Sequence, residues 1–254
     1  MPLLGIIGTG MIGSSVGLAA RQRGWNVLGY DVFTLSAGLA IDAGAVERVA
    51  SRDEIYAACE VIVIAAHVAA TIDELAALRL RSLRDDQLVI DVASVKAPII
   101  RAAAGMHAFV ATHPMAGSER SGPQAARADL FTERTWCYVP GEDAARTERA
   151  RSLIEGFGAV PFAVDAQEHD AIVALTSHLP QLLAYAFTQR VGDLRAAHDP
   201  ALVDALCGPA ARELLRLGRS SPQMWNDIFA ANGEAVQGEL ERLQRAIDDR
   251  RLSG

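Results

Sequence analysis

The chain has 254 residues, of which 50% are hydrophobic and 22% are charged, and its formal net charge at pH 7 is −7. This length accommodates one large domain or two of ordinary size, and the composition is that of a globular protein with a packed core. The negative charge argues against nucleic acid or an anionic membrane surface as a partner.

The three cysteines, Cys59, Cys137 and Cys207, are odd in number and far apart in the sequence. This pattern is typical neither of a disulfide framework nor of a metal site, so we expect no metal and a reducing, cytoplasmic environment. The apolar N-terminus lacks the basic segment of a signal peptide. The apolar run at 171–191 contains histidine, proline and glutamine, which favours a buried helix over a membrane span.

A strand, a glycine-rich turn and a helix open the chain. Leu3–Ile7 is typical of a buried strand, and the next six residues have the spacing G-x-G-x-x-G. The following strand, Asn26–Tyr30, ends at Asp31, where dinucleotide-binding folds carry an acidic residue. The cofactor-binding residues predicted here are Gly8, Thr9, Gly10, Met11, Ile12, Gly13 and Asp31.

Each glycine of this turn has a physical task in a dinucleotide site. Gly8 permits the tight turn, Gly10 lets the backbone approach a pyrophosphate, and Gly13 lets helix and strand pack closely. The helix N-terminus offers amides and a positive dipole to the phosphates. The Asp31 carboxylate would bind a ribose diol and repel a 2′-phosphate, and residues 32–35 include no Arg or Lys, so we predict NAD rather than NADP.

Two further apolar strands are expected at Val61–Ile64 and Gln87–Asp91. The first leads into Ala65 and Ala66, whose small side chains leave room for the nicotinamide half of the cofactor. The second is followed by Ser94, which could cap the next helix while its hydroxyl faces the same sheet edge. All three residues are assigned to the cofactor site.

The apolar run Ala108–Thr112 predicts another buried strand, and a polar loop follows from His113 to Gly122. Loops beyond the carboxyl ends of strands are where open α/β sheets bind ligands, although a solvated turn is the alternative for this segment alone. Strand, helix and strand then follow at 135–139, 144–156 and 159–164. This alternation predicts a doubly wound sheet over residues 1–164.

From Asp165 onward the pattern is helical only, so we place a domain boundary between residues 164 and 165. Helices are expected at about 168–195, 200–217 and 222–249. They are too apolar to be solvated on every side, which favours packing against a second subunit. The helical domain, 165–254, is therefore expected to form a homodimer.

The first of these helices contains Ser177, His178 and Gln181 around Pro180, which we expect to kink it. The kink would free polar groups for a ligand, but a satisfied core histidine is an equally good interpretation.

Arg212, Arg216 and Arg219 have the spacing i, i+4 and i+7 and are expected to share one helix face. A solvated basic stripe is the ordinary interpretation, and a carboxylate-binding site is the functional one. Trp225 follows soon after and could either line such a pocket or pack in the core.

Together these segments resemble the prephenate/arogenate dehydrogenases of tyrosine biosynthesis. The matching segments span nearly the whole chain in the family's order. They are the Gly8/Gly10/Gly13 turn, Asp91-Val-Ala-Ser94-Val-Lys96, His113-Pro-Met-Ala-Gly-Ser118 with Ser121-Gly122, Glu168-His169-Asp170, Ser177-His178-Leu179-Pro180, and Arg216 followed by Ser221-Pro222 and Met224-Trp225.

The resemblance implies an α/β fold, with a Rossmann-type doubly wound sheet followed by an all-helical dimerisation domain. It also implies NAD as cofactor and a cyclohexadiene carboxylate as substrate. The reaction would be oxidative decarboxylation of prephenate to 4-hydroxyphenylpyruvate, of arogenate to tyrosine, or of both.

The resemblance further implies roles for single residues. His113 resembles the catalytic histidine that takes the proton of the ring hydroxyl, and Ser94 the serine that holds this histidine and the nicotinamide in register. Arg216 resembles the arginine that binds a substrate carboxylate. The substrate-binding residues are thus expected to be His113, Ser118, Ser177, His178, Gln181, Arg212, Arg216 and Trp225.

The chain departs from the family at the far end of the pocket. Gly208-Pro-Ala-Ala211 replaces a Gly-Gly-Gly-Phe run, the arginine is preceded by Arg212-Glu-Leu-Leu, and Gln181 replaces a histidine. The choice between prephenate, arogenate and an amino-substituted prephenate of a specialised biosynthetic cluster stays open.

Two other classes remain as alternatives. A β-hydroxyacid dehydrogenase would carry a catalytic lysine beyond the sheet, whereas the single lysine, Lys96, lies within it. A non-catalytic NAD-binding sensor would have no need of His113, Ser94 and Arg216 together.

Overall fold

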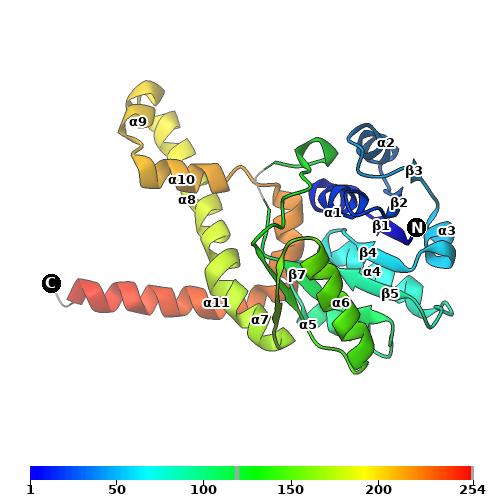
Figure 1. Cartoon of the computed structure of the whole chain (residues 1–254). Helices are drawn as coiled ribbons and strands as arrows, with labels where there is room; N and C mark the ends of the chain where they lie inside the picture. The colour runs from blue at the N-terminus through cyan, green and yellow to red at the C-terminus, as the bar shows by residue number, and fades with distance from the viewer. Residues whose placement is uncertain (118–119, 253–254) are drawn as a thin grey trace. The chain divides into compact units, whose positions relative to one another are not determined.

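A six-stranded parallel sheet is the centre of the N-terminal part of the chain in the computed structural model (Figure 1). Its strands are β1 (Leu3–Ile7), β2 (Asn26–Tyr30), β3 (Arg48–Val49), β4 (Val61–Ile64), β5 (Leu88–Asp91) and β6 (Phe109–Val110). They are arranged in the order β3-β2-β1-β4-β5-β6, so the order reverses at β1, as in Rossmann-type sheets. The predicted doubly wound sheet is confirmed for the strands up to residue 110, whereas the strands predicted at 135–139 and 159–164 lie in a second sheet and not in this one.

The structure describes residues 1–117 and 120–252, apart from the side chains of residues 251 and 252. The chain divides into two compact units, Met1–His169 and Asp170–Gly254.

Helices cover both faces of the parallel sheet. They are α1 (Met11–Arg21), α2 (Thr34–Asp42), α3 (Arg52–Ala58), α4 (Val68–Arg79), α5 (Ala97–Ala102) and α6 (Ala144–Gly156). Buried residues of α1 and α6, including Val16 and Ile154, join Leu4 and Ile6 of β1 in one core cluster. The intervening Gly5 points to the opposite face, where α3 packs so closely that a Cβ on Gly5 would lie 2.3 Å from Ile55 Cγ2.

A second sheet of three strands contains β7 (Thr112–Pro114), β8 (Thr135–Tyr138) and β9 (Val160–Ala163). β7 pairs with β8 in antiparallel register and β8 with β9 in parallel register. A short 3-10 helix, η1 (Pro123–Ala125), lies between β7 and β8 in the sequence.

The prediction that His113 begins a loop was wrong, because His113 lies inside β7. The chain leaves β5 after Val110, since the Thr112 amide donates to Asp91 Oδ1 at 2.9 Å instead of to the β5 backbone. The Ala111 carbonyl then accepts a hydrogen bond from the Val139 amide at 2.9 Å. The run 108–112 therefore passes from one sheet to the other.

The rest of the chain is helical, as predicted. It contains α7 (Ala166–Val173), the π-helical segment η2 (Ala174–His178), α8 (Leu179–Ala197), α9 (Pro200–Leu206), α10 (Pro209–Leu217) and α11 (Pro222–Leu252). The stretch Ala166–Ala197 is long and apolar enough to cross a membrane by length and composition, and 33% of its most apolar segment is buried. A π-helical segment and Pro180 interrupt this stretch, which also contains the buried polar side chains of His178 and Gln181.

Two expected helices are divided in the structure. The kink expected at Pro180 takes the form of η2, which ends just before it, because proline has no N–H to donate to the regular ladder. The helix expected over 200–217 breaks at Cys207 and Gly208, since Pro209 starts a new helix.

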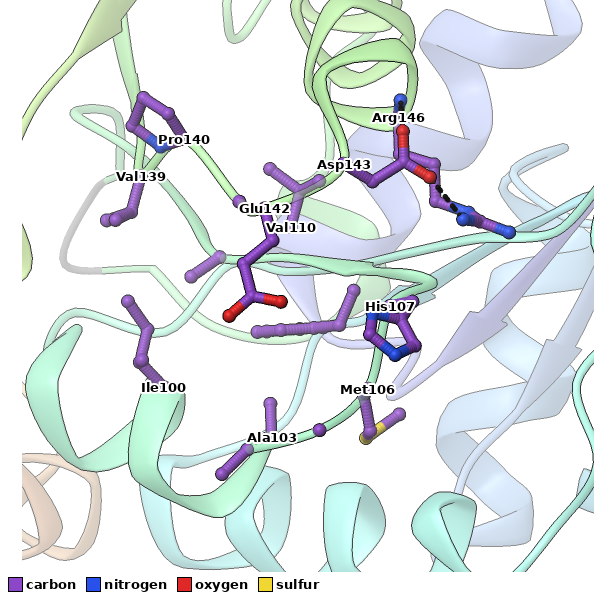
Figure 2. A pocket seen from close by; sticks show the side chains of 15 residues that line it. Ile100, Ala103, Met106, His107, Val110, Val139, Pro140, Glu142, Asp143 and Arg146 are labelled. Carbon is purple, nitrogen blue, oxygen red and sulfur yellow. Dashed lines mark hydrogen bonds and ion pairs between the residues drawn. The ribbon is translucent and has the colours of Figure 1, made fainter.

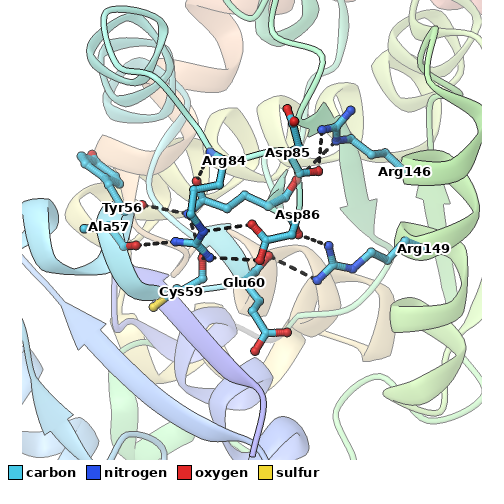
Figure 3. A network of polar contacts seen from close by, with 10 residues as sticks. Tyr56, Ala57, Cys59, Glu60, Arg84, Asp85, Asp86, Arg146 and Arg149 are labelled. Atoms are coloured by element: carbon cyan, nitrogen blue, oxygen red, sulfur yellow. Dashed lines mark hydrogen bonds and ion pairs between the residues drawn. The ribbon is translucent and has the colours of Figure 1, made fainter.

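Two arginines of α6 donate hydrogen bonds to the backbone of the segment that precedes β5 (Figure 3). Arg146 donates to the Asp85 carbonyl at 2.9 Å, and Arg149 donates to the carbonyl of Asp86. Arg84 in turn donates to the Cys59 carbonyl and pairs with the Asp86 carboxylate at 2.9 Å. These contacts fix the entry to β5, whose last residue belongs to the candidate site.

Candidate active site

The strand register brings the predicted cofactor residues to one edge of the sheet. Ile7, Ile64 and Asp91 are the last residues of β1, β4 and β5, and they are aligned with one another. The glycine turn, Ala65 and the loop with Ser94 therefore leave the sheet side by side at its carboxyl edge. This is the edge at which such sheets bind nucleotides.

The glycine turn has the shape that a dinucleotide site requires. Gly8 has φ +96°, and a Cβ there would lie 2.4 Å from the Ala65 carbonyl oxygen. A Cβ on Gly13 would lie 2.0 Å from the Gly8 carbonyl oxygen, whereas one on Gly10 would meet nothing within 4 Å. Gly8 and Gly13 are therefore needed for close packing, and the open space beside Gly10 is available to a pyrophosphate.

The neighbouring residues of the cofactor prediction lie on the elements around this turn. Met11 and Ile12 form the first turn of α1, which begins with Gly10 as N-cap. The Ala66 carbonyl accepts a hydrogen bond of 3.1 Å from Thr71 Oγ1 at the start of α4.

Asp31 is held in place at the end of β2 by three donors. Its Oδ2 accepts from the Thr9 amide at 2.8 Å and from Thr9 Oγ1 at 3.0 Å, and its Oδ1 accepts from the Phe33 amide at 2.9 Å. The residues that follow it, 32–35, are exposed and carry no positive charge. A ribose would therefore meet an oriented carboxylate, which fits NAD.

A buried polar network surrounds Thr112, the residue before His113. Asp91 and Lys96 are both completely buried and form an ion pair, and Lys96 also donates to the Thr112 carbonyl. Asp91 accepts from the Thr112 amide, and Trp136 Nε1 donates to Thr112 Oγ1 at 2.9 Å. We call Asp91, Lys96, Thr112 and Trp136 the Thr112 network. It fixes every polar atom of Thr112 in a site closed to solvent.

The network orients His113. Side chains alternate along a strand, and Thr112 and Pro114 are buried while His113 between them is half-buried. The imidazole therefore faces away from the network.

A second imidazole lies directly against His113. His113 Nδ1 and His169 Nε2 are 2.9 Å apart, and the rings meet edge to face with centroids 5.1 Å apart. His169 belongs to α7 and is 3% exposed. Neither His169 nor Lys96 was among the predicted site residues, and their only indication in the sequence was membership of the segments that resemble the family.

Ser94 is half-buried in the loop after β5. It does not cap the following helix, as the sequence suggested, because α5 begins at Ala97 and its N-cap residue is Lys96. Among the described residues the Ser94 hydroxyl makes no hydrogen bond to His113. Ser118 lies outside the described residues.

The C-terminal unit bonds two predicted substrate residues internally. His178 is 1% exposed, and its Nδ1 is 3.2 Å from the side-chain nitrogen Nδ2 of Asn232. Asn232 lies within α11 and has a non-helical backbone conformation. Gln181 is 3% exposed and donates to the Leu217 carbonyl at 2.8 Å. These contacts favour structural roles for both side chains.

Ser177 and Trp225 are half-buried in the same unit. The Trp225 ring lies edge-on to His178, with centroids 6.0 Å apart. Its buried Nε1 has no hydrogen-bond partner among the residues that the structure describes, so it is a donor that a ligand could satisfy.

Arg212 and Arg216 lie on α10, which has no buried residue. Arg216 is bonded to the Glu213 carboxylate through two contacts of 3.0 and 2.7 Å, and this bonding lowers the pKa of Glu213. Arg212 donates to the Cys207 carbonyl at 2.9 Å. The expectation that Arg219 shares their face was wrong, because α10 ends at Leu217.

Within the described part of the chain, no group of three His, Cys, Asp or Glu residues could hold a metal ion. A cavity of about 240 Å³ lies between the loop that precedes β6 and the start of α6, lined in part by Met106, His107 and Glu142 (Figure 2). The cavity extends along β6 from that loop to Ala111 and Val139, and its lining residues include none of the predicted site residues. Arg146 at its rim is already paired with Asp143.

Two family descriptions cover the chain. Residues 16–162 match "Prephenate dehydrogenase, nucleotide-binding domain", and residues 165–251 match "Prephenate dehydrogenase, dimerization domain".

Individual proteins are similar over the same length. The chain is 37% identical over 251 residues to the probable prephenate dehydrogenase NovF of Streptomyces niveus. This match covers 95% of this chain and 66% of that protein. It is 30% identical over 254 residues to the prephenate dehydrogenase of Lactococcus lactis, covering 96% of this chain and 69% of that protein. The chain thus spans about two thirds of the length of these relatives.

A solved structure has the same fold. The crystal structure of prephenate dehydrogenase from Aquifex aeolicus, in complex with hydroxyphenyl propionate and NAD⁺, superimposes with a TM-score of 0.86 at 25% sequence identity. The match covers 98% of this chain and 89% of that one.

Proposed function

The chain belongs to the prephenate dehydrogenase family, and we propose that it is an NAD-dependent dehydrogenase that oxidatively decarboxylates prephenate, arogenate or both. One structural observation carries the proposal. The Thr112 network fixes His113 at the carboxyl edge from which the glycine turn also emerges. A candidate base and a nucleotide turn at one edge are what an alcohol dehydrogenation needs.

NAD, when bound, supplies the acceptor for the hydride. The space beside Gly10 and the oriented Asp31 carboxylate support its binding here. Thr9, Met11, Ile12, Gly13, Ala65, Ala66 and Ser94 complete the proposed cofactor site.

His113 is proposed as the general base. A neutral imidazole with an ordinary pKa of about 6.5 can take the hydroxyl proton near neutral pH. Removal of this proton accompanies oxidation of the carbinol carbon. The ring carboxylate then leaves as CO₂, and its bonding pair moves into the ring. The ring oxygen takes back a proton to become a phenol hydroxyl, and the gain of aromaticity makes the reaction favourable.

Arg216 is proposed to bind a substrate carboxylate. Its two contacts to Glu213 are the bidentate arrangement in which a guanidinium binds a carboxylate, and a substrate carboxylate could take the place of Glu213. The remaining substrate residues proposed are Ser118, Ser177, His178, Gln181, Arg212 and Trp225. His178 and Gln181 are both bonded within the C-terminal unit, and we propose that they contribute to substrate binding by holding neighbouring residues in place.

We further propose a cytoplasmic homodimer, with the domain boundary between residues 164 and 165. The match to a dimerisation domain supports the homodimer, as do exposed apolar residues on the helices: Ile172, Leu175, Leu202 and Leu206.

The test is a turnover assay that combines each cofactor with each substrate. NADH or NADPH formation is followed with prephenate and with arogenate, and a 3-hydroxy acid is the control substrate. We expect turnover with NAD⁺ and at least one cyclohexadiene, and at least about tenfold less with NADP⁺, because Asp31 repels a 2′-phosphate. NAD⁺ binding without turnover would support the sensor alternative, and no signal in any combination would overturn the proposal.

A further inference from the structure

The contact between His113 and His169 restricts which nitrogen of each ring carries a proton. Two neutral imidazoles whose nitrogens are 2.9 Å apart form a hydrogen bond only if one nitrogen is protonated and the other is not. With Nδ1 of His113 engaged by His169, Nε2 is the nitrogen that can meet a substrate hydroxyl.

We propose that His169 is a positioning residue that holds His113 in the tautomer protonated at Nδ1. The inference rests on the proposed function, since it concerns the proposed base. A general base needs a free lone pair at the nitrogen that faces its substrate. His113 then donates from Nδ1–H, and His169 Nε2 accepts.

A hydrogen bond in the opposite direction, from His169 to His113, would prevent His113 from acting as a base. If His169 Nε2 carried the proton, His113 would accept at Nδ1 and bear its own proton on Nε2. That N–H would face the hydroxyl whose proton has to be removed. Both groups would then be donors, and His113 could not accept the proton. The proposed direction also stays favourable during the reaction, because His113 still donates from Nδ1 once it has become positively charged, and the bond is then charge-assisted.

The backbone on both sides holds the two rings in place. His113 follows Thr112, whose polar atoms are all bonded in the buried network. His169 lies in α7, whose first turn is capped by Asp165, which accepts from the amides of Gln167 and Glu168 at 2.9 and 3.0 Å. His169 is also buried, so water competes little for its Nε2.

Among the described residues, three other ionisable groups lie beneath Thr112 or opposite His113. Lys96 and Asp91, beneath Thr112, form an ion pair with each other. Cys137, opposite His113 in β8, has its thiol pKa raised by burial, against a smaller lowering by Lys96. His169 Nε2 lies at hydrogen-bond distance from His113 Nδ1, so it acts on the His113 proton directly.

Two variants of His169 separate hydrogen bonding from packing. His169→Gln brings an amide oxygen close to the position of Nε2, where it can accept from His113. His169→Phe keeps a flat ring of similar size without an acceptor.

The tautomer is measured by NMR of protein with ¹⁵N-labelled histidine, in the absence of substrate and cofactor. The His113 signals, identified by their loss in His113→Asn, are expected to show the Nδ1–H form in the wild type and in His169→Gln. In His169→Phe this preference should be lost. A wild-type His113 protonated at Nε2, or a His169→Phe spectrum like that of the wild type, would overturn the inference.

Steady-state kinetics give the second readout. We expect His169→Phe to lower kcat about 10- to 100-fold, a part of the usual contribution of a general base, while KM stays within about twofold. Because the charged His113 loses its acceptor, the acidic limb of the kcat/KM profile should move to lower pH. His169→Gln should recover most of the rate.

An unchanged kcat and pH profile in His169→Phe would contradict the role of His169. A wild type without turnover on prephenate and arogenate would instead contradict the proposed function, and the NMR result would still decide the tautomer.

Discussion

The surroundings of His113 and of Arg216 differ in how much the fold has organised them. Thr112 is bonded through its amide, carbonyl and hydroxyl to buried groups, and Lys96 and Asp91 are completely buried. Arg216 lies on a helix without a buried residue, and its side chain is 43% exposed. The N-terminal unit thus prepares its reactive group internally, whereas α10 presents charge to its surroundings.

For the same reason, a substitution that removes a charge should reduce the stability of the fold by different amounts in the two regions. An exposed ion pair contributes about 0–1 kcal/mol, because water solvates either partner when the other is removed. Removing one partner of a buried pair leaves a charge that neither water nor protein compensates. Substitutions should therefore affect stability in the Thr112 network and substrate binding on α10.

The largest effect on stability is expected for Lys96→Met. This change leaves the buried Asp91 carboxylate without its cation, and it should destabilise the fold by about 3–5 kcal/mol, measured by urea unfolding followed by circular dichroism.

The double variant Lys96→Met/Asp91→Asn is the control. It removes both charges and keeps an oxygen for the Thr112 amide, so it should recover much of the loss. A single variant within about 1 kcal/mol of the wild type would show that the network does not organise this region.

A smaller effect, on binding rather than stability, is expected for Arg216→Gln. Loss of a charge-assisted contact to a substrate carboxylate should raise KM about 10- to 100-fold and leave the urea midpoint where it is in the wild type.

Arg195→Gln is the matched control, because Arg195 is also exposed and paired with a carboxylate, that of Asp204 at 2.6 Å. Its KM should not change. Equal KM values for the wild type and Arg216→Gln would place the carboxylate-binding residue elsewhere.

Local signals in the sequence predicted the nucleotide end of the molecule well. The strand, the glycine turn and Asp31 lie within 31 residues, and each has its own steric or electrostatic requirement. Their placement at one edge follows from parallel pairing alone.

The base end depended on contacts between distant residues, which no local pattern encodes. The second sheet starts where Asp91 accepts a hydrogen bond from the amide of Thr112, 21 positions away, whereas the apolar run 108–112 by itself predicts a single strand. The partner of His113 is 56 positions away. The arginine stripe was overestimated because helical spacing continues through Gly218, whereas the helix ends there.

The variant His113→Asn tests most directly whether His113 is the base of an NAD-dependent dehydrogenation. The side chain is half-buried and faces away from the Thr112 network, so the variant should fold and bind NAD⁺ with an unchanged Kd. With the substrate preferred by the wild type, we predict a kcat at least about 100-fold lower, the usual contribution of a general base. A near-normal kcat in a variant that still binds NAD⁺ would contradict the account.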